Sequence, residues 1–134
     1  MKTFFATLIC LTVLASSYGQ LTENSKKDRM VYNLVSSYDH DTEKWSVWDK
    51  TDEVFVLNYM DKGDIARFRP NEKMILYKKK TNVPVETGKT SEGNNYKIII
   101  VRESFLEFTF KIYDDPSIGL ELNVGRVKLR FAKK

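Results

Sequence analysis

The stretch from Gly93 to Tyr113 reads GNNYKIIIVRESFLEFTFKIY. It contains two strand-like segments joined by a polar break at Arg102–Ser104. In the second segment, apolar residues at 106, 108, 110 and 112 alternate with polar ones, and this period of two puts one apolar face against a core. The first segment is apolar at every position from Ile98 to Val101, which is typical of a strand covered on both faces. We therefore expect two central β-strands here.

Shorter strands are expected on either side of this pair, separated by turn residues. Alternating or apolar runs predict strands at Met30–Val35, Lys44–Trp48, Glu53–Met60, Ile65–Arg69, Met74–Lys78, Leu120–Val124 and Val127–Phe131. Residues 79–95 form the longest irregular region, with one weak strand expected near Val83–Val85. Short strands at regular spacing predict an all-β protein, either an antiparallel β-sandwich or, as the alternative, a small β-barrel.

The N-terminus has the pattern of a secretory signal peptide. Lys2 supplies a positive charge, an apolar run follows from Phe4 to Ala15, and small residues Ser17 and Gly19 close the segment. We expect residues 1–19 to be a signal peptide, residues 20–29 a flexible N-terminal arm, and residues 30–134 a single β-sandwich domain. The expected location is secreted and extracellular.

Composition excludes several classes of secreted protein. Cys10 is the only cysteine and lies in the expected signal peptide, so a disulfide-stapled toxin or growth-factor scaffold is excluded. Lys2 is one of 22 basic residues, so its removal leaves 21 against 18 acidic residues and a formal charge of +3. A balance this small does not indicate a nucleic-acid partner, and no second apolar run predicts membrane insertion. The oligomeric state is left open.

Three short phrases resemble a known family. Asp64–Asn71 is similar to the galectin strand that reads Asp-Ile-Ala, then His, Phe, Asn, Pro and Arg; Gly93–Ile98 and Gly125–Leu129 resemble the phrases of two later galectin strands. The resemblance implies a concanavalin-like jelly roll of two antiparallel sheets. Its sugar-contacting positions differ, because Arg67, Arg69 and Asn71 stand where the family has His, Asn and Arg.

The leading functional hypothesis is a non-enzymatic lectin-like module that recognises carbohydrate or anionic, sulfated surfaces. Arginine forks bind sugar or sulfate oxygens and aromatic faces stack on sugar rings, so we nominate six residues for ligand binding. These are Arg67, Arg69, Asn71, Glu86, Trp45 and Trp48. Strand alternation places the two tryptophans on opposite faces of one strand, so one can fill the core while the other is covered by a loop or stands at the surface as a stacking platform; the alternative is that both are packed.

Basic residues gather on the last expected strand. Val127, Leu129 and Phe131 are expected to point inward, which turns Arg126, Lys128 and Arg130 outward. This basic patch suits sulfated glycans; the alternative is a solvated face whose charges discourage strand-to-strand aggregation.

No motif predicts catalysis, a metal or a cofactor. His40 is the only histidine, and a metal site usually needs three or four ligands. No Gly-x-Ser-x-Gly elbow surrounds a serine. Two alternatives to the lectin hypothesis stay open, namely a β-barrel carrier of a small hydrophobic ligand and an extracellular interaction or structural domain.

Overall fold

The computed structural model describes residues 26–134; the expected signal peptide and most of the expected arm lie outside the described residues. The described chain consists of strands and turns without a helix. The ten strands are β1 (Asp28–Asp39), β2 (Lys44–Trp45), β3 (Asp49–Leu57), β4 (Ile65–Phe68), β5 (Ile75–Lys79), β6 (Glu86–Lys89), β7 (Asn95–Glu103), β8 (Leu106–Tyr113), β9 (Leu120–Val124) and β10 (Val127–Ala132).

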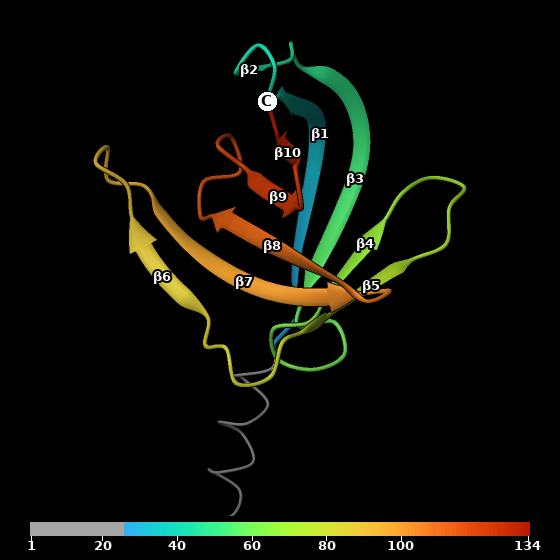
Figure 1. The fold of residues 1–134 in the computed structure, drawn as a ribbon. Coiled ribbons are helices and arrows are strands. Elements are labelled where there is room, and N and C mark those ends of the chain that lie inside the picture. The colour runs from blue at the N-terminus through green and yellow to red at the C-terminus, as the bar shows by residue number, and fades with distance from the viewer. Residues whose placement is uncertain (1–25) are drawn as a thin grey trace, which may run out of the picture.

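Eight of these strands form one closed antiparallel barrel (Figure 1). The hydrogen-bonded order is β10-β9-β8-β7-β5-β4-β3-β1, and β10 returns to pair with β1 from Leu34↔Ala132 to Ser37↔Leu129. The all-β prediction is confirmed, and the architecture is that of the barrel alternative. The two facing sheets implied by the galectin resemblance are not found, because a single sheet closes on itself and buries its own inner face.

The central pair predicted from residues 93–113 is the longest hairpin of the barrel. β7 and β8 pair from Tyr96↔Tyr113 to Glu103↔Leu106. The connection is a two-residue turn at Ser104 and Phe105, a little later than the predicted polar break, and both residues have positive φ (48° and 67°). That combination is the geometry of a type I′ turn, whose twist matches the flanking strands.

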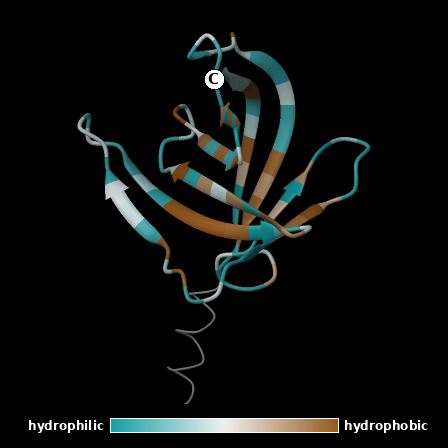
Figure 2. Cartoon of the chain, viewed as in Figure 1, coloured by the Kyte–Doolittle hydropathy of each residue, from teal (hydrophilic) through white to brown (hydrophobic). Residues whose placement is uncertain are grey.

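Side chains fill the interior of the barrel. Inward positions of neighbouring strands meet in register, as at Ile99↔Phe110 and Phe110↔Leu122. Figure 2 shows hydrophobic residues concentrated along β7 and the nearby parts of β1 and β3, whereas the far arch of β3 is largely hydrophilic. The fully buried large side chains are Tyr77, Phe55, Phe110, Phe131, Ile65, Ile99, Leu120 and Val101.

Several element boundaries differ from the sequence prediction, including those of β3, which runs from Asp49 to Leu57 instead of Glu53–Met60. β1 begins at Asp28, so Asp28 and Arg29 belong to the barrel and not to a flexible arm; they pair with Leu57 and Val56. β2 ends at Trp45 instead of continuing to Trp48. The weak strand of the 79–95 region is β6, which starts after the predicted Val83–Val85 because it pairs with β7 from Glu86↔Ile98 onward.

The barrel wall divides beside β7. β5 pairs only with the C-terminal end of β7, at Lys78↔Arg102 and Lys79↔Val101, whereas β6 pairs with its N-terminal half. The N-terminal half of β7 therefore separates from β5 at the end of the barrel where β1 begins and β3 ends. We call this the open end, and the pocket of the candidate site lies there.

Candidate functional site: a mouth pocket and an outer tryptophan–arginine cluster

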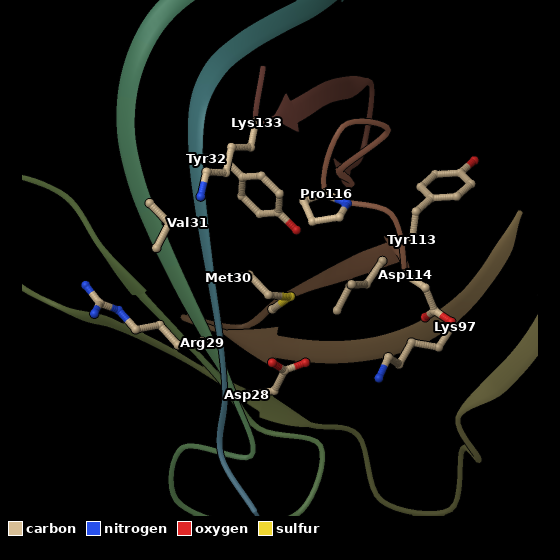
Figure 3. A pocket seen from close by; sticks show the side chains of 11 residues that line it. Asp28, Arg29, Met30, Val31, Tyr32, Lys97, Tyr113, Asp114, Pro116 and Lys133 are labelled. Carbon is tan, nitrogen blue, oxygen red and sulfur yellow. The ribbon is translucent and has the colours of Figure 1, made fainter.

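The open end holds a pocket of about 340 Å³, which we call the mouth pocket (Figure 3). It reaches from β1 across the barrel to β7 and β8, which are not neighbours of β1 in the sheet, so it occupies the entrance to the interior. In Figure 3 the side chains of Met30 and Tyr32 point into it, whereas those of Arg29 and Val31 point away. The lining residues are Asp28, Arg29, Met30, Val31, Tyr32, Lys97, Ile112, Tyr113, Asp114, Pro116 and Lys133.

Lys97 is the central charged group of the open end. It is half-buried, it comes from an inward position of β7 opposite Ile112, and it lines the mouth pocket. It also lines a smaller pocket of about 180 Å³ at the divided wall, beside Leu57 and Ile99. Among residues 26–134, Lys97 forms no salt bridge. Its ammonium group is therefore available to a ligand at the edge of an apolar lining.

The remaining polar groups of the mouth supply both signs of charge and a neutral donor. In Figure 3 the carboxylates of Asp28 and Asp114 lie on the Lys97 side of the pocket. The pKa of the Tyr32 hydroxyl is raised far above its usual value, first by burial and then by the negative charge of Asp28. Tyr32 therefore stays protonated at physiological pH and offers a hydrogen-bond donor in the pocket.

A layer of aromatic rings ends the pocket on its inner side. Tyr32 packs on Phe55 with ring centroids 6.0 Å apart, and Phe55 packs on Phe131 at 5.2 Å and on Phe110 at 5.8 Å. These phenylalanines are fully buried. A ligand that enters the mouth meets this packed layer, so the available space suits a small molecule and not a long chain.

Arg67 lies inside the barrel on the far side of this layer. Its guanidinium donates two hydrogen bonds to Glu53, from Nε to Oε2 (3.0 Å) and from Nη2 to Oε1 (2.8 Å). It also lies over the rings of Phe55 and Phe131, 5.6 and 5.4 Å from their centroids. Burial alone would lower the pKa of Arg67, but hydrogen bonding with Glu53 and the nearby Tyr77 raises it, so Arg67 stays charged.

The residues expected to form a galectin-like site are consequently separated. Arg67 faces the interior, so it does not share a surface with Arg69, which pairs with Glu72 at 2.6 Å. Asn71 follows in the β4–β5 turn, where its φ is +60°. Glu86 is exposed on β6. No contact of the described residues brings these four side chains together.

Trp45 and Trp48, in contrast, lie on one side of the sheet. Their rings hold the guanidinium of Arg130 between them, each centroid 4.5 Å from its central carbon. The prediction that they face opposite sides of a strand is wrong, because β2 ends at Trp45 and strand alternation does not extend through Ser46 and Val47 to Trp48. We call Trp45, Trp48 and Arg130 the outer cluster.

The expected basic patch continues the outer cluster along β10. Lys128 Nζ lies 5.2 Å from the ring centroid of Tyr38, and Lys134 Nζ lies 5.0 Å from that of Trp48. The third predicted member, Arg126, occupies the β9–β10 turn, where its carbonyl oxygen accepts a hydrogen bond from Nε2 of His40. The described residues contain no group of three His, Cys, Asp or Glu side chains able to hold a metal ion.

Sequence reasoning missed the residues of the mouth pocket. One signal was present, since Lys97 is a charged residue directly before the apolar run Ile98–Val101 and in phase with its inward positions 99 and 101. Asp28 and Asp114 gave no comparable signal, because strand ends and turns are rich in aspartate.

Comparison with known protein families, with curated proteins and with solved structures found no match to this chain. Within residues 26–134 no helix is long and apolar enough to cross a membrane. Functional inference therefore depends on the mouth pocket and the outer cluster themselves.

Proposed function

We propose that the protein is a non-enzymatic carrier that binds a small amphipathic molecule in the mouth pocket. The observation that carries this proposal is the half-buried residue Lys97, without a salt-bridge partner in the described residues, at a pocket lined by both apolar and charged side chains. Closed barrels hold small ligands at such mouths. We further propose, from the signal-like residues 1–19, that the carrier acts outside the cell.

The lining defines the chemistry of the ligand. A volume of about 340 Å³ is near the lower limit for small-molecule sites, so the ligand has the size of one or two rings. Its apolar part packs on Met30 and Ile112, and an anionic group pairs with Lys97. Tyr32 donates a hydrogen bond to a neutral oxygen of the ligand. The carboxylates of Asp28 and Asp114 favour a ligand that also carries a donor.

The proposal is tested with 5-(dimethylamino)naphthalene-1-sulfonate, a fluorescent dye with a two-ring apolar system and one anionic group. We expect saturable fluorescence enhancement with the wild-type protein. Met30→Trp fills the pocket from a half-buried position and is expected to weaken binding at least tenfold, whereas Leu106→Trp, on an exposed site at the other end of the barrel, leaves it unchanged. Equal binding by both variants, or no enhancement with folded wild type, contradicts the carrier function.

Carbohydrate recognition in the galectin manner, with the sandwich fold it implies, has less support. Arg67 is engaged by Glu53 inside the barrel, and Arg69 by Glu72. What supports recognition of an anionic glycan is the outer cluster, which uses other residues and a different face of the molecule.

A further inference from the structure

In the outer cluster, two tryptophan rings restrict the position of the Arg130 guanidinium. Arg130 is half-buried on the outer face of β10, and its guanidinium carbon lies over the rings of both Trp45 and Trp48, 4.5 Å from each centroid. Contact with two indole rings restricts the motion of the guanidinium. Its N–H groups remain a planar fork from which a partner can accept hydrogen bonds.

This fork has no acceptor among the described residues. Arg130 forms no salt bridge within 4.0 Å, and its Nε is buried without a hydrogen-bond partner. Glu121 is its cross-strand neighbour on β9 but does not pair with it. An external anion cannot reach the buried Nε, so it would bind through the Nη groups. A bidentate oxyanion such as sulfate or carboxylate can accept from both of them.

Two lysines extend the site in one line. Lys128 and Arg130 are two residues apart on the same outer face of β10, about 7 Å along a strand. Lys134, just beyond the end of β10, lies over the ring of Trp48. Like Arg130, both lysines are held against aromatic rings and form no salt bridge among the described residues. Three oriented cations in a row match a linear ligand with repeated anionic groups.

We propose that this face binds a linear sulfated glycan, with one sulfate in the fork of Arg130 and neighbouring sulfates at Lys128 and Lys134. This second site is independent of the mouth pocket. A single-stranded nucleic acid fits less well, because its bases need open aromatic faces and those of the two tryptophans already carry cations. The indole edges beside the cations give the sugar rings an apolar contact.

The chain contains its own reporter for this test, because its only two tryptophans are those that flank Arg130. Tryptophan emission is recorded while a size-fractionated heparin oligosaccharide is added at several salt concentrations. We expect saturable quenching or a wavelength shift, with affinity that falls as salt rises.

Variants separate the shape of the fork from its charge. Arg130→Lys keeps the charge and removes the planar fork, so affinity is expected to fall about tenfold with little change in the salt slope. Lys128→Ala and Lys134→Ala each lower the slope by about one. Glu121→Gln removes the carboxylate beside the fork and is expected to raise affinity about twofold. Arg102→Lys, on an exposed position of β7, is the matched control and leaves binding unchanged.

Three results would overturn the proposal: equal affinities for Arg130→Lys and Arg102→Lys, equal binding of the desulfated oligosaccharide, or equal binding of a single-stranded DNA of matched charge. Folding of each variant is checked by near-ultraviolet circular dichroism. If Arg130→Lys disturbs the fold, Trp45→Phe tests the same prediction, because a smaller ring holds the fork less firmly and affinity falls while charge is unchanged. Met30→Trp leaves the glycan affinity unchanged, so failure at one site is distinguished from failure at the other.

Discussion

At the scale of single residues, the Arg67–Glu53 pair sets the strictest requirement on the interior. Glu53 is 3% exposed, and Arg67 covers it with two hydrogen bonds while stacking on Phe55 and Phe131. A buried ion pair contributes little net stability compared with apolar residues of the same size, but the loss of one partner leaves an unpaired buried charge. The pair is therefore best read as a constraint on which side chains can occupy this layer.

Glu53→Gln is expected to lower the free energy of unfolding by about 3–5 kcal/mol, because Arg67 keeps its charge in the interior without a counter-ion. The matched control is Glu72→Gln, which breaks the half-exposed Arg69–Glu72 pair at a cost of less than about 1 kcal/mol. Replacing both buried partners, as Glu53→Leu with Arg67→Met, is expected to restore most of the loss. Urea unfolding curves measure all three, and similar losses for Glu53→Gln and Glu72→Gln would contradict the assignment.

Single residues were also where sequence reasoning was weakest. The alternation around Phe68 predicts that Arg67 and Arg69 share one side of the strand. In the structure β4 ends at Phe68, and the chain turns before Arg69 can follow Arg67 inward. An arginine in the interior is not expected unless its partner is known, and Glu53 is fourteen residues away. Trp48 was misplaced for the same reason, since alternation holds only while the strand continues.

At the scale of elements, the β7–β8 hairpin depends on an unfavourable turn. Ser104 and Phe105 both have positive φ, a conformation that glycine and asparagine adopt readily and phenylalanine does not. The side chain of Phe105 is 98% exposed, so no packing compensates for the strain. The pairing of β7 with β8 must therefore hold the turn in place.

Replacing the turn by Ser104→Asn with Phe105→Gly is expected to raise the free energy of unfolding by about 1 kcal/mol, because Asn-Gly prefers the type I′ geometry. The control is Arg126→Gly in the β9–β10 turn, where the preceding Gly125 already supplies the positive φ of 56°. There a second glycine only adds freedom to the unfolded chain and lowers stability. A loss of stability in the Asn-Gly variant would show that Phe105 makes a contribution that its exposure does not reveal.

Element positions, in contrast to single residues, were mostly predictable. Apolar alternation located every barrel strand to within a few residues, because one face of each strand is buried. Alternation does not say which strands pair, so closure of β10 onto β1 could not be read from the sequence. The sequence also does not indicate that β5 and β6 pair with different parts of β7. The open end and its pocket, which result from this division of the wall, could therefore not be predicted.

At the scale of the whole molecule, one tyrosine and two lysine side chains hold their protons more tightly in the barrel than in the unfolded chain. The pKa of Tyr32 is raised by burial and by Asp28. Hydrogen bonds to Asp64 and Asp61 raise that of Lys78, and a hydrogen bond with Tyr113 raises that of Lys111. In every case the native state keeps a proton that the unfolded state releases first. The protein is therefore expected to lose stability on the alkaline side.

Tyr32 allows this linkage to be measured at one position. Below pH 10, the approximate pKa of an unfolded tyrosine, Tyr32 is protonated in both states and its contribution to the free energy of unfolding is fully present. Above pH 10 the unfolded chain ionises while the native hydroxyl does not, so the free energy of unfolding falls by about 1.4 kcal/mol per pH unit. Urea unfolding between pH 9 and pH 11.5 should therefore show a steep decline for wild type. Tyr32→Phe is expected to reduce that slope by about one proton. Equal slopes for Tyr32→Phe and wild type would mean that the Tyr32 hydroxyl ionises as readily in the barrel as in the unfolded chain, which would contradict its burial among the aromatic rings.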